Sequence, residues 1–206
     1  MIEDIYNGLR PKGKRRNLTQ AKEEPWLPSG KGLSLSVSKV PEQNWNKATY
    51  EKWDDFLCGG WLEEWAAKKI RTCINASAEA VEVGVRCQRK FSPKVEFEID
   101  VALIRGHRLY VVSCSTAQKK ALCKSKLFEV AMRARQMGGD LARSALVCLL
   151  HGDDGGGSYV DQLRSDIKSL WDAPNVPGVF GLDDLREWHG ASGDPNLESL
   201  RQWLES

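Results

Sequence analysis

Two acidic and two small polar side chains near the middle of the chain have a spacing that suits metal-dependent phosphodiester chemistry. Glu98 and Asp100 alternate with the apolar residues of the stretch 97–103, so a strand there would carry the acids on one face and the apolar residues on the other. Ser113 and Ser115 follow with the same alternation, which puts them on one face of the next strand. This is the layout of a metal-dependent nuclease site.

Three short motifs in this region resemble those of the PD-(D/E)XK nuclease superfamily, and most closely the nuclease domain of CRISPR-associated CARF-nuclease proteins. The pattern of that family is roughly G-G-x-L-E, then N-E-I-D-V, then E-C-K-T. The chain reads Gly59-Gly60-Trp61-Leu62-Glu63, then Phe97-Glu98-Ile99-Asp100-Val101, then Ser113-Cys114-Ser115-Thr116. The Glu and the Lys of the third family motif are therefore both serine in this chain.

The resemblance implies that active members hold Mg²⁺ or Mn²⁺ with one helix carboxylate and two strand carboxylates, while the lysine orients water or supplies positive charge. The metal ligands implied here are Glu63, Asp100 and the carbonyl oxygen of Cys114. A neutral serine hydroxyl is a weak Mg²⁺ ligand and cannot replace either lost charge. The candidate catalytic residues are Asp100, Glu63, Ser113, Ser115 and Glu98.

Two functions follow from this altered motif, and the sequence leaves both open. The first is a catalytically degenerate or inactivated nuclease-like protein that binds nucleic acid or a partner protein in a CRISPR or other defence complex. The second is an active metal-dependent nuclease of DNA or RNA, with Glu98 as the third acid and Lys119 or Lys120 in the vacant ammonium position. Mg²⁺ or Mn²⁺ is expected as cofactor only in the second case.

The rest of the sequence supplies the elements that must position these residues. Helical spacing of apolar residues predicts helices at 61–74 and 121–136. Alternating or continuous β-rich patterns predict strands at 81–85, 97–103, 109–114 and 146–149. The order α-β-β-β-α-β resembles the restriction-endonuclease-like α/β fold, a mixed sheet flanked by helices. We assign residues 1–45 to a basic arm containing Pro and Gly, and residues 46–206 to the nuclease-like domain.

The charge balance limits how the chain could contact nucleic acid. With 28% charged residues and a formal net charge of only +2, the whole protein does not have the cationic character of a dedicated nucleic-acid binder. Contact must therefore depend on local basic groups. The candidates are Arg10, Lys12, Lys14, Arg15, Arg16, Arg86, Arg89, Lys90, Lys119, Lys120 and Lys124.

Cysteine usage and hydropathy indicate a cytoplasmic protein. The 6 cysteines include no C-x-x-C pair, which favours reduced thiols over a zinc site or a disulfide framework. The N-terminus lacks the apolar region of an export signal, and no stretch approaches the roughly 20 apolar residues that span a membrane. We expect no membrane contact, and the resemblance is compatible with a homodimer.

Overall fold

The computed structural model describes residues 59–75, 80–89, 92–151, 158–172, 175–190 and 193–206. The chain divides into two units, Met1–Trp61 and Leu62–Ser206, and the fold reported below is that of the second unit. The N-terminal arm predicted at 1–45 lies outside the described residues, as does the predicted start of the domain at residue 46. The same holds for the basic candidates Arg10, Lys12, Lys14, Arg15 and Arg16.

A five-stranded mixed sheet with the order β1-β2-β3-β4-β5 forms the centre of this unit. Strands β1 (Val81–Arg89), β2 (Ser92–Arg105) and β3 (Arg108–Ser115) make an antiparallel meander. Strands β4 (Arg143–Cys148) and β5 (Gly178–Phe180) then run parallel to β3. Because parallel neighbours cannot be joined by a tight turn, the chain must cross over a face of the sheet between them.

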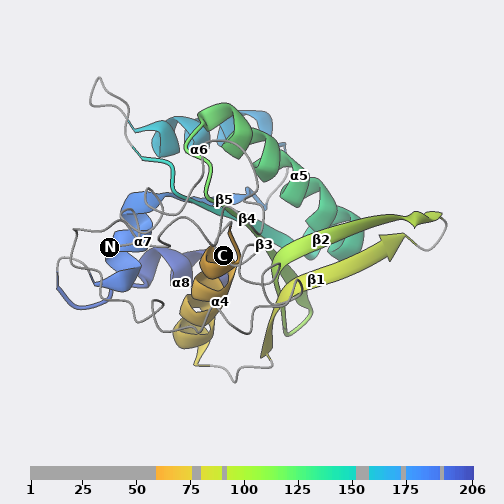
Figure 1. Cartoon of the computed structure of the whole chain (residues 1–206), viewed down its shortest axis with the longest axis horizontal. Coiled ribbons are helices and arrows are strands. Elements are labelled where there is room, and N and C mark those ends of the chain that lie inside the picture. The colour runs from red at the N-terminus through yellow and green to blue at the C-terminus, as the bar shows by residue number, and fades with distance from the viewer. Residues whose placement is uncertain (1–58, 76–79, 90–91, 152–157, 173–174, 191–192) are drawn as a thin grey trace, which may run out of the picture. The chain divides into compact units, whose positions relative to one another are not determined.

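Helices cover both faces of the sheet (Figure 1). Helices α5 (Lys120–Gly138) and α6 (Tyr159–Leu170) make the two crossovers and lie on one face. Helices α4 (Trp61–Ile74), α7 (Leu182–His189) and α8 (Glu198–Glu205) lie on the other. The short 3₁₀ helix η5 (Gly139–Leu141) connects α5 to β4.

The core under α5 and α6 fixes the crossover helix against the sheet. Leu127 of α5, Leu146 of β4 and Leu163 of α6 are fully buried in one cluster. A second cluster packs Val130 of α5 against Val111 of β3. Each such side chain contributes roughly 1.5–3 kcal/mol through burial. The apolar stripe of α5 therefore determines which of its polar residues point toward the strands.

The opposite face is packed mainly by aromatic rings. Tyr110 of β3 meets Trp203 of α8 edge to face with ring centroids 5.6 Å apart, and the Tyr110 hydroxyl donates to the Leu204 carbonyl oxygen at 2.9 Å. Gly178 of β5 leaves room for Trp203, because a Cβ atom there would lie 2.9 Å from the indole ring. These contacts hold the C-terminal helix on the sheet.

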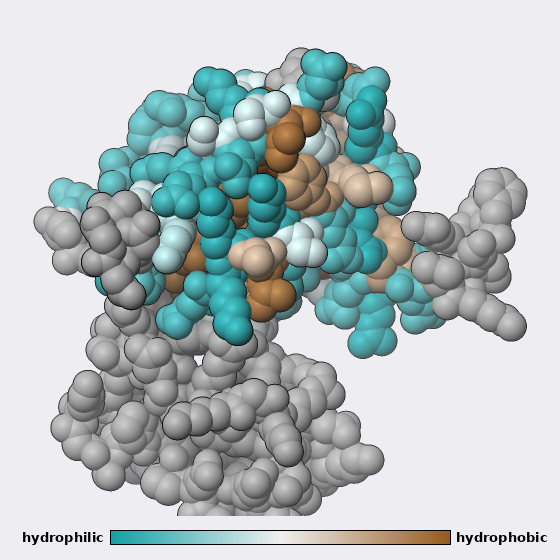
Figure 2. Space-filling view, turned by 90° about the horizontal axis from the view of Figure 1, so that it is seen from above, coloured by the Kyte–Doolittle hydropathy of each residue, from teal (hydrophilic) through white to brown (hydrophobic). Residues whose placement is uncertain are grey.

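The surface seen from the α5 and α6 side is mainly hydrophilic, with apolar side chains gathered in small patches (Figure 2). Within the described residues no helix is both long and apolar enough to cross a membrane. The predicted α/β fold class is confirmed. All four predicted strands and both predicted helices are present, and the strands at 81–85 and 97–103 extend further than predicted as the long hairpin β1–β2.

The prediction that the apolar residues of 97–103 share one face is wrong. Ile99 packs in the cluster under α5, whereas Leu103 pairs with Tyr110, whose ring faces α8 on the other side. The break falls where the β1–β2 register omits a pair between Gly84 and Asp100. Gly84 has φ of 64°, a left-handed conformation that glycine adopts without strain. Ile99 before Asp100 and Leu103 after it therefore lie on opposite faces of the sheet.

Candidate functional site

Strands β2 and β3 separate next to Asp100. Their pairing ends at Val101↔Val112, while β3 continues to pair with β4 as far as Ser115↔Cys148. We call the opening between Asp100 on β2 and residues 113–115 on β3 the fork. The backbone groups of β3 that face this opening have lost their strand partner, and buried N–H groups need another acceptor.

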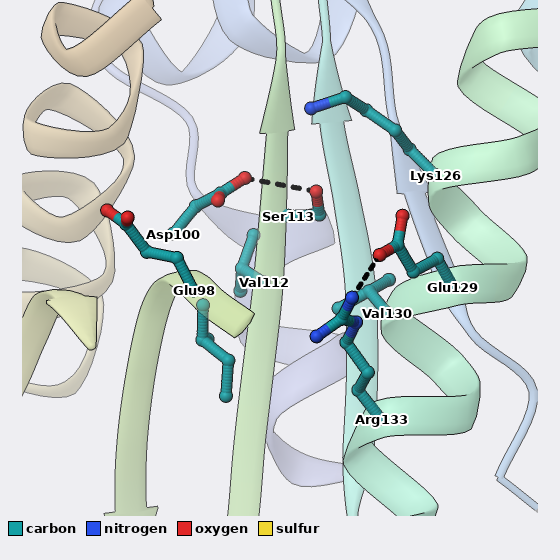
Figure 3. Close-up of a pocket in the computed structure, with 9 residues that line it drawn as sticks. Glu98, Asp100, Val112, Ser113, Lys126, Glu129, Val130 and Arg133 are labelled. Atoms are coloured by element: carbon teal, nitrogen blue, oxygen red, sulfur yellow. Dashed lines mark hydrogen bonds and ion pairs between the residues drawn. The ribbon is translucent and has the colours of Figure 1, made fainter. Parts of the chain in front are cut away.

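The carboxylate of Asp100 supplies that acceptor. Its Oδ2 atom accepts a hydrogen bond from the backbone N–H of Cys114 at 2.6 Å and another from the hydroxyl of Ser113 at 3.0 Å. Figure 3 shows the Asp100 and Ser113 side chains pointing toward one another across the fork. Both bonds end on the same oxygen, so among the described residues the Oδ1 atom has no hydrogen-bond donor.

Glu63 approaches the fork from α4, where it lies in the first turn of the helix. The pKa of Glu63 is raised from 4.5 to about 7, first by burial and then by the negative charges of Asp100 and Glu98, while Lys126 opposes this rise. The structure thus brings Glu63, Glu98 and Asp100 within electrostatic reach of one another. A carboxyl group with such a pKa can exchange a proton near neutral pH.

Lys126 of α5 reaches the fork from the opposite side, and sequence reasoning did not select it. Its Nζ atom lies 3.4 Å from the carbonyl oxygen of Cys114. It lines a cavity of about 140 Å³ together with Glu98, Asp100 and Ser113 (Figure 3). A signal was present in the sequence: Lys126 directly precedes the core residue Leu127, so its side chain lies at the edge of the buried helix face.

Two further residues of α5 border the same cavity. Arg133 forms an ion pair with Glu129, one helical turn before it, and its guanidinium carbon lies 4.3 Å from the ring centroid of Phe97. Glu129 and Arg133 both line the cavity with Lys126. Arg133 is therefore held in place by two partners, whereas the ammonium of Lys126 contacts only a backbone carbonyl among the described residues.

The two serines of the third motif have different surroundings. Ser113 lines the cavity and donates to Asp100. Ser115 is only 4% exposed, and its Oγ atom accepts a hydrogen bond from the backbone N–H of Ala117 at 3.3 Å. Ser115 therefore stabilises the turn that leads toward α5 and does not line the cavity.

Lys119 and Lys120, which were expected to fill the ammonium position, lie elsewhere, as do the other basic candidates whose side chains the structure describes. Lys120 and Lys124 form ion pairs with Asp166 of α6 at 3.5 and 3.0 Å, so they tie the two crossover helices together. Lys119 is exposed just before α5 and does not line the cavity. Arg86 is exposed on β1. The side chains of Arg89 and Lys90 are outside the described part of the chain.

The oxygen donors at the fork have the chemistry that Mg²⁺ or Mn²⁺ prefers. However, no three Asp, Glu, His or Cys side chains of the described residues are grouped closely enough to hold a metal ion. Asp100 already accepts two hydrogen bonds through one oxygen. A cation at the Cys114 carbonyl would also have to displace the Lys126 ammonium. The residues in this arrangement do not fit a metal ion held by the protein alone.

Comparisons with known proteins bear on this site. The sequence model of the Card1-like endonuclease domain matches residues 50–155, a range that contains Glu63, Asp100 and Lys126. No curated protein sequence matches the chain.

Two solved structures resemble the fold. The first is protein VC1899 from Vibrio cholerae, with 20% identity and a TM-score of 0.54 over 75% of this chain and 36% of that chain. The second is Can2 from Sulfobacillus thermosulfidooxidans in complex with cyclic tetra-adenylate, with 13% identity and a TM-score of 0.53 over 77% of this chain and 40% of that chain. The match therefore spans less than half of either protein, and identities this low show the fold alone.

Proposed function

Because the chain belongs to the family of Card1-like endonuclease domains, we propose that it binds nucleic acid at the fork and, with serine at position 113, cleaves it weakly or not at all. Its family is CRISPR-associated and nuclease-like. The proposal keeps the partner class expected from the sequence, which is nucleic acid, in a CRISPR or other defence context.

One observation carries the proposal: the position that should hold an acid on β3 holds a hydrogen-bond donor. The Ser113 hydroxyl donates to Asp100 at 3.0 Å, so it satisfies the carboxylate and adds no negative charge. The fork therefore has one carboxylate fewer on β3 than the resembled motif offers to a divalent cation.

Nucleic acid can still be attracted to such a site, because phosphate contacts depend on cations and not on a metal-binding triad. Lys126 and Arg133 line the cavity from α5. Arg86 and Lys119 are exposed on the same unit. These local groups support binding despite the small net charge, and such binding should weaken steeply as salt rises.

An active nuclease is the second candidate, and Lys126 is the observation that favours it. Its ammonium lies at the fork without a lysine being present at position 115. Glu98 lines the same cavity as Asp100, so it is the residue available as a third carboxylate. On this proposal the protein hydrolyses DNA or RNA phosphodiesters and requires Mg²⁺ or Mn²⁺.

A cleavage and binding experiment separates the two candidates. Single- and double-stranded DNA and RNA are incubated with the wild-type protein, Ser113→Glu, Ser113→Gln and Ser113→Glu/Asp100→Ala in Mg²⁺ and in Mn²⁺. We expect salt-sensitive binding by the wild-type protein and cleavage only by Ser113→Glu. Ser113→Gln controls for size, because it lengthens the side chain without adding charge.

Two outcomes of this experiment would contradict the proposal, each in a different part. Wild-type turnover at about 1 per second or faster, the range of ordinary enzymes, would replace the degenerate site with the active one. Absence of binding to all four substrates at low salt would reject nucleic acid as the partner, and a protein partner would then be the better hypothesis.

A further inference from the structure

We propose that Lys126 of α5 is the phosphate-binding ammonium of the fork, and that it takes over the place that the resembled motif gives to a lysine at position 115. The inference rests on the proposed function, because it assigns a role at the same site. If Lys126 has this role, the site lacks only the carboxylate of position 113, and not both the carboxylate and the ammonium of the resembled motif.

The surroundings of position 115 leave little space for a lysine directed at the fork. Ser115 is 4% exposed, and its hydroxyl is engaged with the Ala117 backbone N–H. Its register partner Cys148 is fully buried in the core cluster under α5 and α6. A lysine there would have to displace core packing or bury its charge, which is costly without a partner. A cation for the fork must therefore come from another element.

Lys126 meets the geometric requirement from the neighbouring helix. It begins on an exposed position of α5, and its Nζ atom reaches the Cys114 carbonyl oxygen, at 3.4 Å, in the middle of the third motif. It shares the cavity with Ser113 and Asp100, and Figure 3 shows its side chain extending from α5 toward them. The flexible stem of a lysine allows its ammonium to follow a bound phosphate.

The Lys126 ammonium is available to bind a phosphate because, unlike the neighbouring cations, it forms no ion pair with a described residue. Lys120 and Lys124 are ion-paired with Asp166, and Arg133 is paired with Glu129. Lys126 has no ion pair with any described residue. It is nevertheless close enough to the acids to oppose the rise in the pKa of Glu63. A cation held near carboxylates, without contact to one, can bind an anionic oxygen with little rearrangement of the protein.

Metal-free binding tests this role without relying on catalysis. Lys126→Met, Lys126→Arg and Lys168→Met are compared with the wild-type protein for binding of a labelled single-stranded oligonucleotide in EDTA over a range of salt. Lys168 is the matched control, since it is an exposed lysine on α6 that does not line the cavity. We expect Lys126→Met to weaken binding and to reduce the salt slope by about one phosphate contact. Lys126→Arg should keep most of the slope, and Lys168→Met should change it little.

Cleavage in the Ser113→Glu background gives an independent readout. We expect Ser113→Glu alone to cut in Mg²⁺ or Mn²⁺. Adding Lys126→Met should lower the rate about 10 to 1000-fold, the range for removing a group that stabilises developing charge. Adding Lys126→Arg should restore part of it. Thermal melting of each variant confirms folding, and the exposed position of Lys126 makes its replacement tolerable.

The results that would overturn the inference differ from those that would overturn the proposed function. An unchanged salt slope in Lys126→Met, or cleavage by Ser113→Glu/Ser115→Lys when Ser113→Glu is inactive, would assign the ammonium to another residue and leave the nuclease-like function standing. A salt slope that falls when Lys119 is replaced, but not when Lys126 is replaced, would also assign the ammonium to another residue. Failure of the wild-type protein to bind any nucleic acid at low salt would reject the proposed function itself.

Discussion

Two regions of the molecule connect neighbouring strands to helices: the aromatic packing beneath α7 and α8, and the fork beside Asp100. They differ in how completely their polar atoms are hydrogen-bonded or ion-paired. The aromatic cluster consists of Trp65, Tyr110, Phe180, Trp188 and Trp203. Its rings form a continuous series of contacts. The Trp188 indole N–H donates to Ser199 at 2.9 Å and the Trp203 indole N–H to the Ser144 carbonyl at 3.2 Å.

The fork has the opposite character. One oxygen of Asp100 takes two donors while the other has none among the described residues. The pKa of Glu63 is raised to about 7, and Lys126 is without an ion partner in the described part of the chain. Perturbed and incompletely paired groups of this kind are the feature on which the proposed binding site at the fork rests.

The largest expected effect on stability comes from the aromatic cluster. Trp188 is 0% exposed, stacks on Trp65 with centroids 6.0 Å apart and packs on Phe180 at 4.8 Å. We expect Trp188→Ala to lower the free energy of unfolding by about 3–5 kcal/mol, measured by urea denaturation. Where the variant is still folded, its salt slope for nucleic acid should equal that of the wild-type protein. A changed slope would show that the two regions are coupled.

A smaller effect is expected at the fork from Asp100. Replacing it with Ala leaves the N–H of the buried Cys114 without its acceptor, which costs about 1–3 kcal/mol. Asp100→Asn is the matched control, because an amide oxygen can still accept from that N–H. We expect urea denaturation to show a clearly smaller loss for Asn than for Ala. Equal losses would mean that the hydrogen bond is not what holds the fork together.

The strands and helices could be predicted from the sequence because their signals are local. Alternation of apolar residues identified β2, and the continuous apolar stretch at 146–149 identified β4. The change of face at Asp100 could not be read in this way, since it coincides with a left-handed Gly84 in the partner strand. A glycine in a strand pattern is compatible with several local geometries.

The residues of the candidate site show the same difference between local and long-range signals. Glu63, Glu98 and Asp100 were selected by motif, and the structure brings their charges together. Lys126 belongs to no motif, and its approach to Cys114 depends on how α5 packs over the strands. Long-range packing of this kind leaves only a weak signal in one sequence. The motif also could not reveal that Ser113 and Ser115 would have such different surroundings.

The smallest expected effect concerns the pH dependence of stability, and Glu63 is its source. The pKa of this carboxyl is raised from 4.5 to about 7, first by burial and then by Asp100 and Glu98. The folded protein therefore holds this proton more tightly than the unfolded chain does. The resulting stabilisation is fully present below about pH 4.5 and is lost as the pH rises through about 7.

Since Glu63 is only half-buried, water screens part of the shift, and we expect a loss of about 1 kcal/mol. Urea denaturation in EDTA between pH 4.5 and 7.5 should show this fall for the wild-type protein relative to Glu63→Gln, in which the group cannot titrate. Lys126→Met should steepen it, because Lys126 is the neighbour that lowers the pKa of Glu63. Parallel pH profiles for the wild-type protein and Glu63→Gln would show that Glu63 keeps an ordinary pKa, and the contrast between the fork and the aromatic cluster would then depend on Asp100 and Lys126 alone.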